Sequence, residues 1–328
     1  MLFKPSLYKQ RIQSLKEHLT TDYLLIEDPT NLRYLTGLSL SKGRLYLSKD
    51  REVLVVDERY FELASRSVKC EVMKWGCFFG EGSIAFEKEF TTYSDYLVLK
   101  KEHPQLEPMA SPTIEVRAIK DRSEIALIQE SARLLNKGYL HIRKKLRVGV
   151  TEEEISKEFY SYTHRIADGP SFEPIVAFGK NGSMPHYRSG DTVLKENMAV
   201  LLDMGVKYKG YCSDMTRMVT FGKIPKKIEV ALDLVKRAKK EAEKVAQIGH
   251  SMTDLQNRAK EVFGDQEKYF VHSIGHGIGL DVHELPRKGA LCENMVITIE
   301  PGLYYPGIGG VRLEDMYLIT EEGCKKLT

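Results

Sequence analysis

The chain of 328 residues is long enough for two ordinary domains, because a single hydrophobic core rarely grows beyond ~250 residues. Hydrophobic residues make up 42% and charged residues 29%, a composition typical of globular proteins in water. The 49 basic and 46 acidic residues leave a net charge of +3, which argues against a nucleic-acid or membrane partner.

The five cysteines are scattered and odd in number, and no two have Cys-x-x-Cys spacing. This pattern does not indicate a disulfide framework, so we expect a reduced, cytoplasmic setting. The sequence has no apolar run of about 18 residues and no signal-peptide core, so neither a membrane span nor export is expected.

The first third of the chain alternates between short apolar runs and helical patterns. Runs rich in Leu, Val, Ile and Tyr predict strands at residues 22–28, 43–48 and 52–58. Helices are predicted at residues 58–66 and 92–103. Strands interleaved with helices favour an α/β domain.

The pattern of apolar and polar residues changes after residues 103–113, where three prolines and weak periodicity predict a linker. Two sequence signals for capped helix starts follow, with a carboxylate three residues after an N-cap residue, at Asp121-x-x-Glu124 and Thr151-x-x-Glu154. The first is expected to open a long helix that ends near residue 146.

From residue 174 onward most of the sequence is strand-like. The strand-like runs are PIVAFG (174–179), residues 199–222, YFVHSI (269–274), MVITIEPGL (295–303) and GVRLEDMYLIT (310–320). A Lys-rich amphipathic helix at residues 225–248 and a shorter helix at 253–263 lie between them. We therefore expect an α+β domain with a largely antiparallel sheet, and place the two domains at residues 1–118 and 119–328.

Two aspartates lie on strands that flank a turn at Tyr208-Lys209-Gly210. With Tyr208 and Lys209 as the loop residues, Asp203 lies directly opposite Asp214; with Lys209 and Gly210 as the loop residues, the two are diagonal neighbours. In both registers the carboxylates share one face. Like charges in a buried strand pair are unfavourable, so a cation between them is favoured over two exposed acids on an edge hairpin.

Two more acids occur where strand chemistry favours apolar residues. Glu300 follows the run MVITI and precedes a Pro-Gly turn, and Glu314 lies in GVRLEDMYLIT. Arg312 shares a face with Glu314 and is a candidate ion-pair partner.

The stretch HSIGHGIGLDVHE, residues 272–284, contains three histidines, although a His-rich glycine loop is more often a surface turn than a metal site. Four carboxylates and one imidazole are too many ligands for a tetrahedral structural zinc site. They suit two divalent cations about 3.5–4 Å apart. Oxygen-dominated ligation with one His favours Mn, with Co, Fe or Zn as alternatives.

The order Asp203, Asp214, His276, Glu300 and Glu314 resembles the five-ligand set of the pita-bread metallopeptidases. This family includes Xaa-Pro aminopeptidases, prolidases and methionine aminopeptidases. The segments LLDMGVKYKGYCSDMTR, HSIGHGIGLDVHE, TIEPG and GVRLED resemble its motifs, and DPTNLRYLTGL and VLVVDERYFELA resemble its creatinase-type N-terminal domain. The resemblance implies a creatinase-like α/β domain followed by an α+β pita-bread catalytic domain with an antiparallel sheet.

The resemblance also implies a role for each ligand. Asp203 corresponds to a ligand of one metal, and Asp214 and Glu314 to the two bridging ligands. His276 and Glu300 correspond to the ligands of the second metal, and Glu300 also to the general base.

Other residues are assigned to the substrate pocket by the same resemblance. His283 corresponds to a catalytic histidine that stabilises the tetrahedral intermediate, and His186, in NGSMPHYRSGD, to one that hydrogen-bonds near the scissile bond. His272 is expected to pack around the proline ring. Arg312 is grouped with the pocket as the arginine that orients the ligands.

The expected function is therefore that of a dinuclear Xaa-Pro aminopeptidase, acting on peptides with proline in second position and forming a homodimer. Prolidase is the alternative, because Arg188 near His186 is a candidate partner for a dipeptide carboxylate. A methionine aminopeptidase is disfavoured, since that branch usually lacks the N-terminal domain and the Arg of GVRLED. A non-catalytic pita-bread binding module is disfavoured because such relatives lose the metal ligands.

Overall fold

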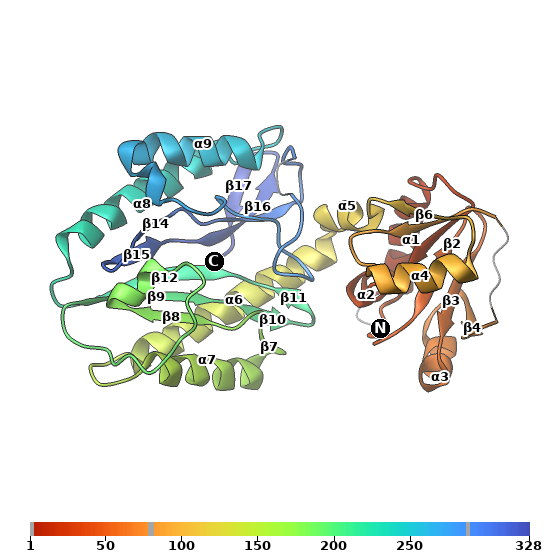
Figure 1. Ribbon diagram of the computed structural model, residues 1–328, viewed down its shortest axis with the longest axis horizontal. Coiled ribbons are helices and arrows are strands. Elements are labelled where there is room, and N and C mark those ends of the chain that lie inside the picture. The colour runs from red at the N-terminus through yellow and green to blue at the C-terminus, as the bar shows by residue number, and fades with distance from the viewer. Residues whose placement is uncertain (1–2, 78–81, 287–288) are drawn as a thin grey trace. The chain divides into compact units, whose positions relative to one another are not determined.

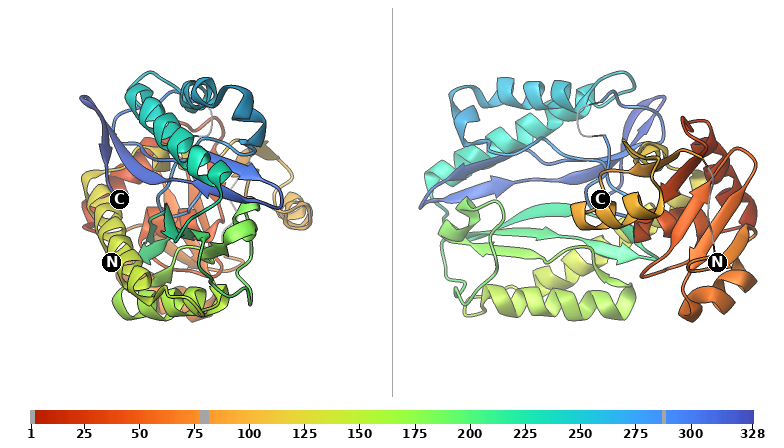
Figure 2. Two further views of the ribbon diagram at one scale, coloured as in Figure 1. Left: turned by 90° about the vertical axis from the view of Figure 1, so that its left-hand side faces the viewer. Right: turned by 45° about the vertical axis from the view of Figure 1, so that its right-hand side comes forward.

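The computed structural model describes residues 3–77, 82–286 and 289–328. The chain divides into two units, Met1–Arg117 and Ala118–Thr328 (Figure 1 and Figure 2).

The N-terminal unit is built on a six-stranded sheet in the order β4-β3-β2-β1-β5-β6. Its strands are β1 (Tyr23–Ile26), β2 (Arg44–Leu47), β3 (Glu52–Val56), β4 (Glu71–Lys74), β5 (Ile84–Glu87) and β6 (Leu106–Met109). Its helices are α1 (Pro5–Lys16), α2 (Pro29–Thr36), α3 (Glu58–Ser67), α4 (Tyr93–Glu102) and α5 (Pro112–Ala118). The α/β class and the predicted strands and helices of this unit are confirmed.

The predicted linker at residues 103–113 is wrong, because this stretch contains β6 and the start of α5. Strand β6 pairs in parallel with β5, and Pro108 lies opposite Phe86. A proline is tolerated here because β6 is an edge strand, where a missing N–H costs no ladder bond to a further strand. Prolines alone were therefore an unreliable sign of a linker.

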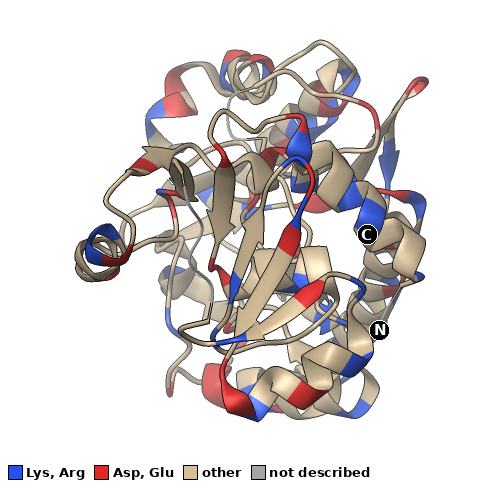
Figure 3. Cartoon of the chain, turned by 90° about the vertical axis from the view of Figure 1, so that its right-hand side faces the viewer, with Lys and Arg blue, Asp and Glu red and all other residues tan. Residues whose placement is uncertain are grey.

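In the view of Figure 3, Lys and Arg are intermixed with Asp and Glu. None of the helices within residues 3–77, 82–286 and 289–328 combines the length and the apolar character needed to cross a membrane.

The second unit has strands between two pairs of helices (Figure 1 and Figure 2). One pair is α6 (Arg122–Lys145) and α7 (Glu152–Ile166); the other is α8 (Lys226–Val245) and α9 (Met252–Phe263). The strands are β7 (Gly169–Pro170), β8 (Ile175–Phe178), β9 (Met198–Met204), β10 (Val206–Tyr208), β11 (Tyr211–Cys212), β12 (Met215–Phe221), β13 (Val296–Ile299), β14 (Gly302–Tyr305), β15 (Gly309–Arg312), β16 (Asp315–Thr320) and β17 (Gly323–Lys326). All of their pairings are antiparallel, as predicted for this domain.

The helices of the second unit begin where the sequence indicated. Reciprocal side-chain to backbone bonds form both predicted capping boxes, Asp121 with Glu124 and Thr151 with Glu154. These bonds satisfy backbone N–H groups that the first helical turn leaves without partners.

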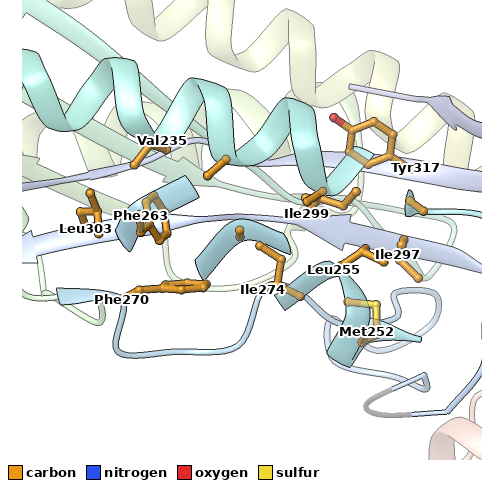
Figure 4. Packing of buried hydrophobic residues seen from close by; sticks show 14 of the residues in the cluster. Val235, Met252, Leu255, Phe263, Phe270, Ile274, Ile297, Ile299, Leu303 and Tyr317 are labelled. Carbon is orange, nitrogen blue, oxygen red and sulfur yellow. The ribbon is translucent and has the colours of Figure 1, made fainter. Parts of the chain in front are cut away.

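The inner faces of α8 and α9 pack on the strands of the C-terminal half. Val235 of α8 and Leu255 of α9 are fully buried, and they lie with Ile297 and Ile299 of β13 in one apolar cluster (Figure 4). Most lysines of α8 are exposed, as the periodicity predicted, but the side chain of Lys239 is only 11% exposed and pairs with Asp315 and Glu243.

The strand predicted at residues 269–274 does not form. A short 3-10 helix, η2 (Gly264–Tyr269), ends there, and the following residues are irregular. One reason is that the backbone N–H of Ile274 donates to the Gln256 side-chain oxygen at 2.5 Å instead of to a strand.

Candidate metal centre

The hairpin that carries the two aspartates adopts the second of the two predicted registers. Tyr208 lies opposite Tyr211, so Lys209 and Gly210 form the loop. Their φ angles are 48° and 84°, which suits a two-residue turn that needs positive φ at both positions. Asp203 pairs with Thr216 rather than with Asp214, and the two aspartates are diagonal neighbours that line the same cavity.

Glu300 and Glu314 reach this cavity from the C-terminal strands. Glu300 directly follows β13, and Glu314 lies in the break between β15 and β16 rather than inside a strand. The backbone N–H of Glu314 donates to the carbonyl of Thr216 at 3.2 Å, and the Thr216 hydroxyl donates to Glu314 Oε2 at 2.8 Å. Thr216 of β12 thereby joins the two groups of carboxylates.

His276 is held beside Glu300 by strand-like backbone pairing with β13. The N–H of Thr298 donates to the His276 carbonyl at 2.8 Å, and the N–H of Glu300 donates to the Ile274 carbonyl at 2.7 Å. Gly275 is required by this close approach, since a Cβ there would lie 2.1 Å from the Thr298 carbonyl oxygen.

The ring of His276 is oriented as a ligand would be. Its Nδ1 lies 3.0 Å from the Gly277 carbonyl, so Nδ1–H donates a hydrogen bond to that oxygen and the lone pair is left on Nε2. Nε2 lies 3.7 Å from Asp214 Oδ2 and 3.7 Å from Glu300 Oε1. Burial lowers the pKa of His276 to about 4, so the imidazole is neutral near pH 7.

The carboxylates are crowded in a way that a cation would relieve. Burial and the neighbouring acids raise the pKa of Asp214 and Glu300 well above the usual range, and that of Glu314 to about 8. Asp203 Oδ1, Asp214 Oδ1 and Glu314 Oε1 are buried and have no hydrogen-bond partner among the described residues. Asp214, His276 and Glu314 each offer a ligand atom within 4.8 Å of the others. Oxygen donors with one imidazole fit divalent cations.

Arg312 is the basic group at the centre of the site. Its guanidinium donates to Asp203 Oδ2, to Thr216 Oγ1 at 3.0 Å and to the Tyr304 hydroxyl at 2.6 Å. The Tyr304 hydroxyl lies 2.8 Å from His272 Nε2, and His272 Nδ1 donates to the Ser273 carbonyl at 2.7 Å. These contacts favour an orienting role for Arg312 over direct substrate contact.

His283 lies next to His276 in space, although it is seven positions further along the chain. The two ring centroids are 4.3 Å apart, and His283 is exposed. Paired backbone bonds between Gly277 and Glu284, at 3.2 and 2.8 Å, close the intervening loop. A Cβ at Gly277 would lie 1.8 Å from the Leu285 carbonyl oxygen, so the loop requires glycine there.

His186 lies on a loop held by a residue that the sequence did not single out. The fully buried Glu152 accepts hydrogen bonds from the Phe178 N–H at 2.6 Å, the Tyr187 hydroxyl at 2.8 Å and the Gly190 N–H at 3.2 Å. No sequence signal indicates this role, because Glu152 is one of three glutamates at a helix start, where acids are expected to be exposed.

The predicted site residues share one cavity of about 880 Å³. Its lining includes every predicted metal ligand and pocket residue, namely His186, Asp203, Asp214, His272, His276, His283, Glu300, Arg312 and Glu314. Phe172, Ile175 and Val282 add apolar surface, and the exposed Arg188 and Glu173 lie 3.7 Å apart on the same lining.

Comparison with known proteins identifies the family. Residues 126–321 match metallopeptidase family M24, and residues 9–119 match the creatinase/prolidase N-terminal domain. The chain belongs to metallopeptidase family M24. As an M24 metallopeptidase it is a hydrolase, its family implies divalent metal ions, and the predicted two-domain pita-bread fold is confirmed.

Similar M24 proteins are named either Xaa-Pro dipeptidase or Xaa-Pro aminopeptidase. The Xaa-Pro dipeptidase of Pyrococcus furiosus is 32% identical over 98% of this chain and 98% of its own. A putative Xaa-Pro aminopeptidase of Mycoplasma genitalium is 31% identical over 96% of this chain and 95% of its own. The solved structure of an Xaa-Pro dipeptidase from Bacillus anthracis superposes with a TM-score of 0.92, at 30% identity, over 99% of this chain and 98% of that one.

Without divalent cations, the protein is expected to lose stability as the pH rises from about 4.5 towards 8. The pKa of Glu314 is about 8 in the folded protein against an ordinary 4.5, so the unfolded chain releases this proton first. The free energy of unfolding therefore falls across this window. Saturating metal at ~100 times its dissociation constant should add about 2.7 kcal/mol. Thermal unfolding of chelator-treated protein, with and without Mn²⁺, measures both effects.

The matched control for this prediction is Glu314→Gln, which removes the titrating group at nearly constant volume. The free energy of unfolding of its metal-free form should depend less on pH between about 4.5 and 8 than that of the metal-free parent. The assignment would be contradicted if the stability of the metal-free parent rose through this pH window and the variant showed the same pH dependence.

Proposed function

We propose that the chain is a dinuclear metal-dependent Xaa-Pro aminopeptidase, which hydrolyses the bond between an N-terminal residue and a following proline. The observation that carries the proposal is the convergence of four carboxylates and the His276 imidazole in one cavity, where several buried oxygens have no hydrogen-bond partner among the residues that the structure describes. The cavity of about 880 Å³ is near the upper end of the ~300–1,000 Å³ typical of ligand pockets. This size supports a peptide that continues beyond the proline.

Asp203, Asp214, His276, Glu300 and Glu314 would hold two divalent cations, with Asp214 and Glu314 shared between them. Bound cations of this kind polarise the substrate carbonyl and activate a water molecule at neutral pH. We propose Mn as the metal because oxygen donors predominate, with Co, Fe and Zn as alternatives. Metal analysis of the purified protein and reactivation of the chelated protein with each ion test this choice.

The chain's own residues would then move the protons and bind the substrate. Glu300 would accept a proton at its carboxylate and return it to the leaving nitrogen. His283 would donate a hydrogen bond to the oxygen of the attacked carbonyl, where negative charge develops. His186 lies on the same lining and is exposed, so it can contact the peptide group.

His272 is suited to the proline ring. Burial lowers its pKa to about 4, and hydrogen bonds to Tyr304 and Ser273 fix its orientation. A neutral ring held in this way presents a flat, weakly polar face, which suits the apolar ring of proline better than a charged group would.

Xaa-Pro dipeptidase is the second candidate, favoured by Arg188. This exposed arginine belongs to the cavity lining, and its partner Glu173 is also exposed, so the guanidinium is accessible to a substrate carboxylate. An arginine at that position suits the C-terminal carboxylate of a dipeptide.

Comparing Xaa-Pro with Xaa-Pro-Yaa peptides separates the two candidates. For an aminopeptidase, kcat/KM should be at least about tenfold higher for the tripeptide, and Arg188→Ala should change KM little. A charge-assisted hydrogen bond contributes about 1.5–3 kcal/mol, so in a dipeptidase that uses Arg188 this variant should raise the dipeptide KM more than about tenfold. Hydrolysis of the dipeptide alone would overturn our first choice.

We also propose that the protein forms a homodimer in a cytoplasmic setting. Analytical ultracentrifugation of the purified chain tests the dimer, and a mass equal to that of one chain would contradict it.

A further inference from the structure

A buried ion pair lies beside the loop that carries His283 and outside the carboxylate cluster. Lys120 Nζ donates to Glu284 Oε2 at 2.9 Å, and the two side chains are only 1% and 4% exposed. The backbone N–H of Lys120 is fixed as well, since it donates to the Asn294 carbonyl at 3.0 Å. Because desolvation largely offsets the attraction in such a pair, net stability alone does not account for it.

The carboxylate of Glu284 fills the inside of the loop between His276 and His283. Glu284 Oε1 accepts a hydrogen bond from the Asp281 N–H at 3.0 Å, while Oε2 accepts from Lys120. A Cβ at Gly279 would lie 2.5 Å from Glu284 Oε2, so the glycine makes room for the carboxylate. The side chain therefore links two separate points of the loop to Lys120.

This arrangement fixes the backbone immediately next to His283. The main chain of Glu284 is paired with Gly277, which directly follows His276. A rigid connection of this kind determines where the exposed His283 ring stands relative to His276, 4.3 Å away between centroids. Without an anchored carboxylate inside it, a glycine-rich loop would have many conformations available.

We propose that Lys120 and Glu284 are positioning residues that hold His283 in place over the metal centre. The inference rests on the proposed function, in which His283 donates to the carbonyl oxygen of the substrate. Neither Lys120 nor Glu284 belongs to the described residues that line the cavity, so both act through His283 and not on the substrate. A displacement of about 1 Å in such a group can reduce turnover about 100-fold.

Two variants test the proposal with different risks for folding. Glu284→Gln keeps the shape but leaves the Lys120 charge buried without a counterion. The double variant Lys120→Met with Glu284→Gln removes both charges at similar volume, a change that is often neutral for stability. As a matched control, Glu229→Gln breaks the exposed Lys226–Glu229 pair, which has a similar distance of 2.8 Å.

Each variant is made in the parent chain and in the His283→Ala background, with metal content, unfolding temperature, kcat and KM measured on an Xaa-Pro-Yaa peptide. In the parent background we expect Glu284→Gln and the double variant to lower kcat about 10–100-fold, the range found for groups that orient a site from outside it, whereas the control Glu229→Gln should keep the parent's kcat. We expect bound metal to be unchanged and KM to stay within about twofold. In the His283→Ala background the same changes should cause no further loss of kcat.

Two outcomes would overturn the positioning role. One is an unchanged kcat in the folded double variant; the other is a loss of kcat that multiplies with that of His283→Ala. A wild-type kcat for His283→Ala alone would instead refute the proposed role of His283, so the two failures are distinguishable.

Discussion

Asp214→Ala is expected to abolish metal binding and peptidase activity together. Asp214 lies centrally among the donors, with Oδ2 3.7 Å from His276 Nε2 and with a buried Oδ1 that has no partner among the described residues. Even groups that only orient a metal ligand typically contribute 10–100-fold to activity, so loss of a ligand that we propose is shared between two ions should cost more than about 100-fold. Metal analysis after dialysis and kcat/KM on an Xaa-Pro-Yaa peptide measure both losses.

The same variant should not destabilise the metal-free protein. Burial and repulsion from Glu314 and Asp203 raise the pKa of Asp214, so removing this group relieves an unfavourable interaction. The unfolding temperature of the chelated variant should equal or exceed that of the chelated parent, while the increase on adding metal disappears. Glu173→Ala, which removes an exposed acid from the same cavity, should retain metal. A fully active Asp214→Ala protein would refute the bridging role.

His283→Ala is expected to leave the metals bound while reducing turnover. His283 is exposed and lies beyond His276, outside the donors that converge at the centre. Removing one preorganised hydrogen-bond donor from a developing oxyanion typically costs about 100–1,000-fold in kcat. The prediction is tested by comparing metal content, kcat and KM with those of the parent protein.

His250→Ala is the matched control, because His250 is also an exposed histidine but is not part of the cavity lining. It should behave as the parent does. Loss of metal in His283→Ala would show that this histidine had been assigned the wrong role.

The metal centre can be predicted from the sequence because its acidic residues occur where strands favour apolar residues. Asp203 and Glu300 each follow a run of apolar strand residues. Because acids are uncommon at such positions, both can be singled out from the sequence alone. The sequence does not determine the hairpin register, because both placements of the turn put the aspartates on one face. The pairing of Tyr208 with Tyr211 decides the register and leaves Lys209 and Gly210 as loop residues with positive φ. Positive φ is uncommon for lysine, so this turn could not be anticipated from the residue type.

The residues that position the site could not be identified in this way. Glu152, Lys120 and Tyr304 occur at a helix start, before a helix and in a strand, where their residue types are unremarkable. Their importance comes from partners far along the chain, such as Glu284 for Lys120. The strand at Leu106–Met109 cannot be recognised from the sequence for a similar reason, because only its edge position makes its proline acceptable.

The positions of the candidate metal ligands along the chain determine when, during synthesis, the full set of ligands is available. Asp203 and Asp214 lie on the central hairpin, whereas Glu300 and Glu314 follow α8 and α9. A nascent chain that has emerged only as far as α9 contains half of the carboxylates and lacks His276. Such a chain cannot capture two ions, unlike small zinc modules whose folding begins with the metal. We therefore expect metal loading to follow the apolar packing that shapes the scaffold for the ions.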